Sequence, residues 1–262
     1  MTQVESQVVK YSDKPVALIT GAGRRVGQGL VAALAERGYR LALHANASLA
    51  AAQQAAEKLK VSGTDALAVA ADLRDQAATQ AMVQQVHEHF GRIDAVVNSA
   101  AIWSPKPLEE VTPDDVREHF EINTLATFTI CQAAGLRMVE QSSGGAIVNV
   151  GDWAIERPYP GYAAYFVSKG SIPTLTRTLA VELATRNPKV RVNAVLPGPI
   201  LFPSDMTPGE RQQIIDATLV KREGTVADLA AAVILLLENT FITGVCLPVD
   251  GGRSVFSGDL RS

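Results

Sequence analysis

One stretch near the N-terminus decides the fold: Val16-Ala17-Leu18-Ile19-Thr20-Gly21-Ala22-Gly23-Arg24-Arg25-Val26-Gly27. It begins as an apolar run of strand type, passes through glycines and continues into a helical pattern. Glycines at a turn between strand and helix let the backbone approach a pyrophosphate, whose charge the helix N-terminus stabilises. The stretch therefore predicts a dinucleotide-binding unit, with an ordinary tight turn as the alternative.

The rest of the chain repeats the alternation of strand and helix. Strands without a polar face that alternate with helices predict a parallel sheet covered on both sides. The expected strands are Val16–Thr20, Arg40–His44, Asp65–Ala70, Asp94–Asn98, Ala146–Val150, Val190–Leu196 and Val245–Val249. The expected helices cover roughly 25–38, 48–61, 75–90, 113–141, 162–187 and 225–238.

We expect one α/β domain over residues 1–262, a doubly wound Rossmann fold with a seven-stranded, mostly parallel sheet in the order 3-2-1-4-5-6-7. Residues 1–14 are expected to form an N-terminal tail. Prolines and a glycine interrupt the alternation over 199–222, which predicts an inserted lid with a short helix. Pro173 falls inside the 162–187 pattern and predicts a bend there. His119 is expected on a helix surface.

Composition excludes several classes of protein. With 47% hydrophobic and 19% charged residues the chain is not disordered, and a net charge of -3 gives no general attraction to nucleic acid or anionic membranes. No apolar run of about 18 residues is present. Cys131 and Cys246 make neither a disulfide framework nor a zinc site. We expect a soluble, cytoplasmic protein that binds a small-molecule substrate and no metal.

The end of the second strand bears on the choice of cofactor. An NAD site usually has an Asp or Glu there for the ribose 2′-hydroxyl, and this strand ends without one. Arg24 could meet a 2′-phosphate, with His44 and Ser48 as hydrogen-bonding helpers. The sequence therefore favours NADP(H), although Arg24 could also be a solvated surface charge.

Tyr165 and Lys169 stand four residues apart at the start of a helical pattern, which places them on one helix face. An ammonium beside a phenol stabilises the phenolate, so the pKa of the tyrosine would move toward a value useful for proton transfer. Such a pair is usually incidental, and it gains weight only from its surroundings.

Those surroundings resemble the short-chain dehydrogenase/reductase family over nearly the full length of the chain. Besides Tyr165 and Lys169, the matching landmarks are the Thr20–Gly27 loop, Ala71-Asp72-Leu73, Asn98-Ser99-Ala100, Asn123, Pro197-Gly198 and Val249-Asp250-Gly251-Gly252.

The resemblance implies roles for several of these residues. Asp72 would meet the adenine, and Asn98 would lie along the cofactor. Asn123 would hold a proton-relay water to Lys169, which would bind the nicotinamide ribose. The long helices would form the subunit interface of a homotetramer. The full expected cofactor set is Gly21, Arg24, Arg25, Val26, His44, Ser48, Asp72, Leu73, Asn98, Ser99, Ala100, Tyr165, Lys169, Pro197, Gly198 and Ile200.

Three positions depart from the common family pattern. Arg25 stands where a glycine is usual, Asp152 stands where a serine is usual, and Trp103 follows the fourth strand. All three are similar to the pteridine reductase branch, which includes bacterial dihydromonapterin reductases. By that resemblance Trp103 would stack a flat heterocycle against the nicotinamide, Arg25 would contact phosphate and pterin, and Asp152 would hydrogen-bond Tyr165.

The chemistry of the Asp152 position supports this interpretation. A carboxylate beside Tyr165 would repel the oxyanion of a carbonyl reduction unless it were protonated, whereas reduction of a C=N bond builds up less negative charge. We therefore expect the catalytic set Asp152, Tyr165, Lys169 and Asn123 to reduce a C=N or C=O bond, most simply in a pterin-like ring. A general carbonyl reductase of the same family and a non-catalytic NADP(H) sensor remain as alternatives. Asp152 could also be structural, Trp103 an ordinary pocket wall and Arg25 ion-paired.

Overall fold

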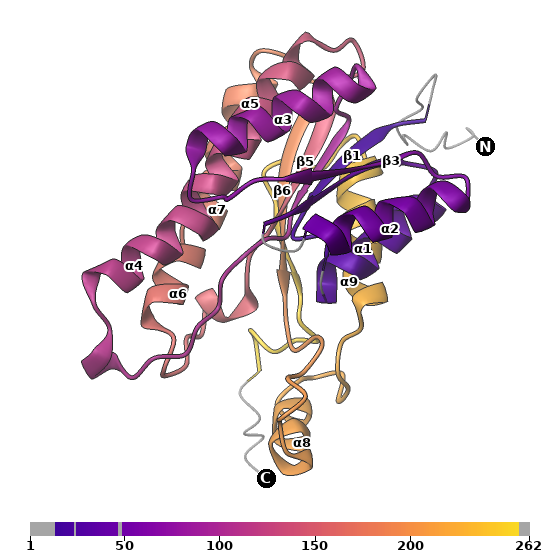
Figure 1. Ribbon diagram of the computed structural model, residues 1–262. Helices are drawn as coiled ribbons and strands as arrows, with labels where there is room; N and C mark the ends of the chain where they lie inside the picture. Colours follow the sequence, from indigo (N-terminus) through magenta and orange to yellow (C-terminus); the bar gives the residue numbers. More distant parts are fainter. Residues whose placement is uncertain (1–13, 24, 47–48, 257–262) are drawn as a thin grey trace, which may run out of the picture.

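A computed structural model describes residues 14–23, 25–46 and 49–256, and within them seven strands form one sheet (Figure 1). The strand order is β3-β2-β1-β4-β5-β6-β7, as predicted, and every neighbouring pair is parallel. The strands are β1 (Val16–Thr20), β2 (Arg40–Ala45), β3 (Ala66–Ala70), β4 (Ala95–Asn98), β5 (Gly145–Val150), β6 (Val190–Pro197) and β7 (Cys246–Val249).

Helices cover both faces of this sheet. One face carries α1 (Arg25–Glu36), α2 (Leu49–Val61) and α9 (Val226–Glu238), and the other carries α3 (Gln76–Phe90), α5 (Ala126–Glu140) and α7 (Ile172–Ala184) (Figure 1). Each face has its own aliphatic core. Because helices bury both faces, a central strand such as β1 has no exposed residue, which explains its apolar sequence. The doubly wound fold expected from the sequence is confirmed.

The expected helix 113–141 contains an irregular turn. Helix α4 (Pro113–Phe120) begins at Thr112, whose side chain forms a capping box with Asp115. A single turn of π-helix, η2 (Glu121–Leu125), then leads into α5. His119 is buried rather than on the helix surface, because its face of α4 packs inward, and Asp115 O lies 2.8 Å from its Nδ1. The surface placement expected for His119 was wrong.

The expected helix 162–187 is two helices. Helix α6 (Ala163–Lys169) ends at Gly170, and α7 begins at Ile172. Pro173 therefore lies in the first turn of α7, where the amide it lacks would have had no helical partner. The expected single helix with a bend at Pro173 is thus two helices separated by Gly170 and Ser171.

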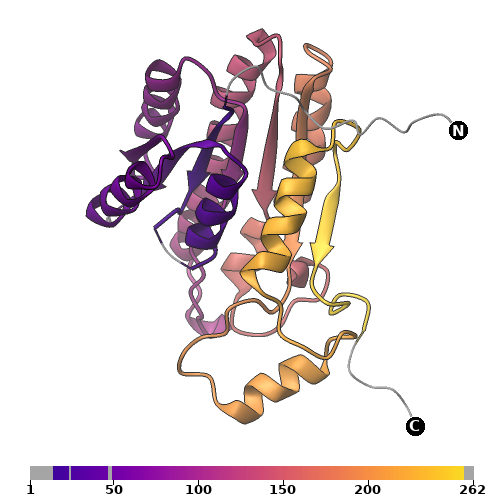
Figure 2. The same cartoon turned by 90° about the vertical axis from the view of Figure 1, so that its right-hand side faces the viewer.

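The lid expected over 199–222 is present at the carboxyl ends of the strands. Its short helix is α8 (Pro208–Asp216), started by a capping box between Thr207 and Glu210 (Figures 1 and 2). Two shorter 3-10 turns, η1 (Leu108–Glu110) and η3 (Trp153–Ile155), also belong to the loops at this end. Among the described helices none has the length and apolarity to cross a membrane.

Candidate active site

A large cavity of about 880 Å³ opens at the carboxyl ends of the strands. Its wall runs from the glycine loop, past the end of β4, to the start of α6 and the lid. Most of the expected cofactor residues line it: Gly21, Arg25, Val26, His44, Asp72, Leu73, Ser99, Ala100, Tyr165, Gly198 and Ile200. Parallel sheets of this kind hold ligands in this crevice.

The glycine loop is packed tightly against its neighbours. Gly21 has φ of 67°, and a Cβ there would lie 3.0 Å from the Ala100 Cα. A Cβ on Gly27 would lie 2.1 Å from the Gly21 carbonyl oxygen. The hydroxyl of Thr20 accepts bonds from the amides of Ser99 and Ala100 at 3.0 and 3.1 Å. Helix α1, which follows, has no acidic residue in its first turn, so the loop leaves a backbone cradle suited to a phosphate.

His44 stabilises this loop from below. The amide of Gly21 donates to its Nδ1 at 3.4 Å, and its Nε2 lies 3.0 Å from the Ala71 carbonyl oxygen. Burial lowers the pKa of His44, which favours the neutral ring. Both ring nitrogens are thus engaged within the fold, and the role of His44 as a hydrogen-bonding helper at a 2′-phosphate stays a prediction. Arg24 and Ser48 lie outside the described residues, while Asn46, at the end of β2, lines the cavity.

Asp152 and Tyr165 are hydrogen-bonded at the cavity wall, as the sequence predicts. The Tyr165 hydroxyl donates to Asp152 Oδ2 at 2.7 Å, while Asp152 Oδ1 accepts from the Ala154 amide at 2.8 Å. Burial raises the pKa of Asp152. Burial, together with the charge of Asp152, raises the pKa of Tyr165 well above its usual value. The pair therefore retains its protons better than either group would in water.

Lys169, on the same helix α6 as Tyr165, lies close enough to Asp152 for their charges to interact. Its ammonium donates to the Val150 carbonyl oxygen at 2.7 Å. Burial lowers the pKa of Lys169 to about 8, while the charge of Asp152 acts in the opposite direction. In this arrangement Asp152, rather than Lys169, makes the direct contact with the phenol. The sequence-based expectation that Lys169 lowers the tyrosine pKa is not met, because the carboxylate lies closer to the hydroxyl.

Asn123 lies in the π-turn η2, which aims its side chain at the loop after β4. Its Oδ1 accepts from the Ile102 amide at 2.9 Å, and its Nδ2 donates to the Ile102 carbonyl and to Ser168 Oγ at 3.1 and 3.0 Å. Asn123 therefore fixes the backbone next to Trp103 to helix α6. The water relay to Lys169 stays a prediction.

Two other expected cofactor residues, Asn98 and Asp72, have partners within the fold, and a third, Pro197, lies at the end of a strand. Asn98 is buried, and its Nδ2 donates to Asn149 Oδ1 at 2.9 Å. Asp72 is paired with Arg74, whose hydrogen bonds lower the pKa of that carboxyl. Pro197 is the last residue of β6 and leads to Gly198 on the cavity wall.

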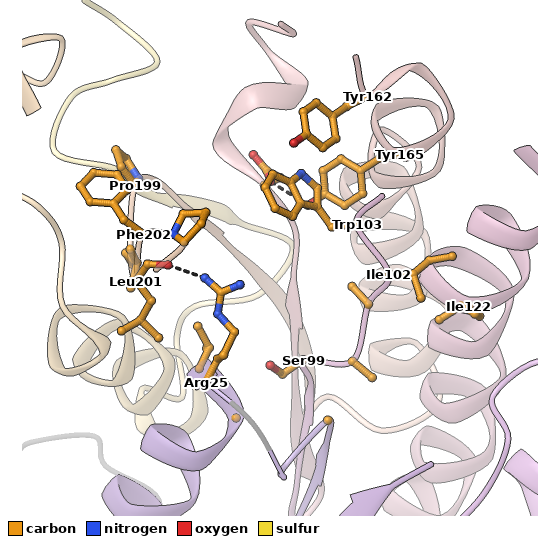
Figure 3. Close-up of a pocket in the computed structure, with 18 of the residues that line it drawn as sticks. Arg25, Ser99, Ile102, Trp103, Ile122, Tyr162, Tyr165, Pro199, Leu201 and Phe202 are labelled. Carbon is orange, nitrogen blue, oxygen red and sulfur yellow. Dashed lines mark hydrogen bonds between the residues drawn. The ribbon is translucent and has the colours of Figure 1, made fainter. Parts of the chain in front are cut away.

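Aromatic side chains form the wall around the catalytic pair (Figure 3). The indole of Trp103 stacks on Tyr162, with ring centroids 4.7 Å apart and planes 8° apart. Tyr159 meets Tyr162 edge to face at 5.3 Å. Tyr162 thus covers one face of Trp103, and the expected stack of Trp103 on a heterocycle stays a prediction for its other surface.

The lid closes the opposite wall of the cavity. Leu201, Phe202, Pro203, Met206 and Ile214 line it. The guanidinium of Arg25 reaches from the glycine loop to donate to the Leu201 carbonyl oxygen (Figure 3). Arg25 has no carboxylate partner in the part of the chain that the structure describes, so the ion-paired alternative for Arg25 finds no support there. Those same residues contain no cluster of His, Cys, Asp or Glu that could hold a metal ion.

Comparison with known proteins then decides the family. The family model described as enoyl-(acyl carrier protein) reductase matches residues 21–254. Versicolorin reductase 1 of Aspergillus parasiticus is 34% identical, with 92% of this chain and 96% of that protein covered. The 3-oxoacyl-[acyl-carrier-protein] reductase of Bos taurus is also 34% identical, with coverages of 90% and 97%. This chain belongs to the short-chain dehydrogenase/reductase family.

A solved structure shows the same architecture as this short-chain dehydrogenase/reductase chain. It is a blue fluorescent protein from a metagenomic library in complex with NADPH, 32% identical to this chain, with a TM-score of 0.84 and coverages of 92% and 98%. The family resemblance expected from the sequence is therefore confirmed. These relatives do not support the pteridine reductase branch.

Sequence reasoning missed part of the wall. Tyr159, Tyr162 and Arg253 also line the cavity, and none of the three is among the expected site residues. The run Tyr159-Pro160-Gly161-Tyr162, just before Tyr165, was an available signal in a chain with only 5% aromatic residues.

Proposed function

We propose that this chain is an NADPH-dependent reductase that acts on the carbonyl group of a flat, largely apolar substrate, with Tyr165 as proton donor. The observation that carries the proposal is the Tyr165–Asp152 hydrogen bond inside a cavity walled by aromatic rings. The names of the relatives, a 3-oxoacyl reductase and a versicolorin reductase, favour a carbonyl substrate.

NADP(H) fits the residues present. The cradle around Gly21 and Gly27 leaves room for a pyrophosphate but not for a side chain, and the end of β2 offers Asn46 rather than a carboxylate. An unpaired carboxylate there would repel a 2′-phosphate. When bound, the cofactor supplies the hydride. The cavity residues named above would hold it, joined by Arg24 as the proposed partner of the 2′-phosphate.

The chain's own residues supply the proton. If Asp152 is ionised, the Tyr165 proton points at the carboxylate and away from substrate. If Asp152 is protonated, its hydroxyl can donate to the tyrosine oxygen, which frees the tyrosine proton for the substrate oxygen. The raised pKa of Asp152 favours this second state and removes the repulsion that a carboxylate would exert on a forming oxyanion.

A specific observation also favours a second substrate class. A carboxyl group in direct contact with the catalytic tyrosine suits proton delivery to a ring nitrogen, which builds up less negative charge than a carbonyl oxygen. Reduction of a C=N bond in a pterin-like ring is therefore the second candidate, and the aromatic wall would accept either class of flat substrate.

One experiment separates the readings. NADPH oxidation is followed with phenanthrenequinone and with dihydrobiopterin, using wild type and Tyr165→Phe. Turnover of the quinone that falls about 100-fold or more in the variant supports the first proposal. Turnover of dihydrobiopterin alone would replace it with the second. NADPH binding without turnover of either, indifferent to Tyr165→Phe, would indicate a cofactor sensor instead.

We also propose that the chain acts in the cytoplasm as a homotetramer. An apolar groove between α5 and α7, lined in part by Leu125, Phe128 and Leu179, supports a subunit contact there. Light scattering after size exclusion measures the assembly, and a monomeric mass would contradict this expectation.

A further inference from the structure

The cavity carries a positive charge that the proton-transfer chemistry does not use. Arg253 lies on its wall, three residues after Asp250 at the end of the last strand. Its guanidinium carbon sits 4.9 Å from the ring centroid of Trp153. Trp153 directly follows Asp152, so this cation faces the cavity beside the catalytic pair rather than at the glycine loop.

The fold holds Arg253 in place through a rigid turn. The Asp250 carboxylate accepts from the amides of Gly252 and Ser254 at 2.9 and 2.7 Å. The Gly251 carbonyl oxygen accepts from the Leu219 amide at 2.8 Å, which fixes the turn to the end of the lid. Asp250 is thus occupied with backbone amides, and the turn presents Arg253 to the cavity.

A second arginine supports the first without neutralising it. Arg157 donates to the carbonyl oxygens of Arg253 and Phe256 at 3.2 and 2.6 Å. No Asp or Glu carboxylate forms an ion pair with Arg157 or Arg253 anywhere in residues 14–23, 25–46 and 49–256. Burial and the charge of Arg157 lower the pKa of Arg253, while the charge of Asp250 acts in the opposite direction. Two neighbouring guanidinium groups that form no direct ion pair with a carboxylate favour binding of an oxyanion.

We infer that the substrate carries a carboxylate or phosphate group and that Arg253 binds it, while the flat part of the substrate lies toward the Trp103–Tyr162 wall. Of the two described arginines that line the cavity, Arg253 donates to the Phe256 carbonyl oxygen at 3.3 Å and Arg25 donates to the Leu201 carbonyl oxygen. The anion is assigned to Arg253 because its guanidinium lies at Trp153, next to Asp152 in the chain. This inference rests on the proposed function, because it specifies the substrate class of the same site.

Binding of unreactive probes tests it without relying on turnover. Isothermal titration calorimetry measures the Kd of 2-naphthoate, 2-naphthyl phosphate and the neutral 2-naphthamide, each with and without saturating NADP+. We expect wild type to bind one or both anions about tenfold or more tightly than the amide. The anion that binds more tightly shows whether the substrate group is a carboxylate or a phosphate. Arg253→Gln should abolish this preference while changing amide binding less than threefold.

Controls keep the result interpretable. Arg186→Gln removes an exposed arginine paired with Glu182, outside the cavity, and should keep the preference. Arg253→Met keeps an unbranched apolar side chain next to Trp153. It is used for the same titrations if Arg253→Gln lowers the stability of the fold. The inference is overturned if wild type binds the anions no more tightly than the amide. It is also overturned if both Arg253 variants keep the preference for the anions, or if Arg25→Gln removes this preference while the Arg253 variants retain it. Because binding is the readout, absence of turnover with quinone and pterin would refute the proposed function separately.

Discussion

Arg25 and Leu201, 176 residues apart, are joined by a hydrogen bond from guanidinium to carbonyl, and both adopt a left-handed backbone with φ of 46° and 56°. One residue starts the helix after the glycine loop, and the other starts the lid. The cofactor loop and the lid are thereby connected directly across the cavity (Figure 3). Left-handed backbone costs a residue with a side chain roughly 1–2 kcal/mol, so the contact is made at strained positions on both sides.

Two substitutions at Arg25 separate the contact from the strain. Arg25→Ala and Arg25→Gly both remove the bond to Leu201, so both should raise the KM for substrate, by about three- to tenfold for an exposed hydrogen bond. Glycine relieves the left-handed strain and alanine does not, so the glycine variant should be the more stable by up to about 1 kcal/mol. Steady-state kinetics and urea unfolding measure the two effects. Equal KM values for wild type and both variants would show that the link to the lid is dispensable.

The Asp152–Tyr165 pair gives the reaction a distinct pH dependence. Burial raises the pKa of Asp152, so the carboxyl stays protonated to higher pH than an exposed aspartate. Carbonyl reduction needs that proton, so kcat/KM should fall as pH rises through the raised pKa of Asp152. Asp152→Asn, which cannot ionise, should remove this limb of the pH profile.

Asp152→Ser extends the same test to substrate choice. A neutral hydroxyl suits an oxyanion, so ketone reduction should rise, by about tenfold, while any C=N reduction falls by about 10- to 100-fold. Initial rates over a range of pH with the quinone and with dihydrobiopterin provide both numbers. An unchanged pH profile in Asp152→Asn would place the titrating group elsewhere.

Cofactor choice should depend on the end of β2. Asn46→Asp places a carboxylate on the cavity wall at the end of β2, where NAD-binding folds hold the acidic residue that binds the ribose 2′-hydroxyl. The variant should therefore bind NADH more tightly and NADPH more weakly, and the ratio of the two Kd values should shift by about tenfold or more. Arg24→Ala should weaken NADPH much more than NADH. Fluorescence titration of both nucleotides measures these effects, with Asn46→Gln as the neutral control. Equal losses of both nucleotides in Arg24→Ala would contradict the 2′-phosphate role.

The sequence predicted the strand order, the glycine loop and the Asp152–Tyr165 contact. The apolar strand runs and the glycine turn before the first helix are short-range signals, whereas the Asp152–Tyr165 contact was expected from the family resemblance. The remaining features depend on contacts distant in sequence. Arg25 meets Leu201 only once the lid has docked, and Arg253 reaches the cavity only because the turn at Asp250 packs against Leu219. His119 is buried because its helix meets α6, which a polar helix pattern does not reveal.

Lys169 makes a last prediction about stability. Its pKa is lowered to about 8 from 10.5, so between these values the folded chain binds fewer protons than the unfolded chain, and stability rises with pH. Below pH 8 the buried ammonium is fully destabilising, by up to about 3 kcal/mol if the whole shift is expressed. Lys169→Met should therefore unfold at higher urea concentration than wild type at pH 7, with the difference shrinking toward pH 10. Its reductase activity should fall at least about 100-fold at every pH, because the lysine lies close to Asp152, which contacts the proton donor. Urea titrations at several pH values measure the stability difference, and a gap that stayed constant with pH would mean that Lys169 titrates alike in the folded and unfolded chains.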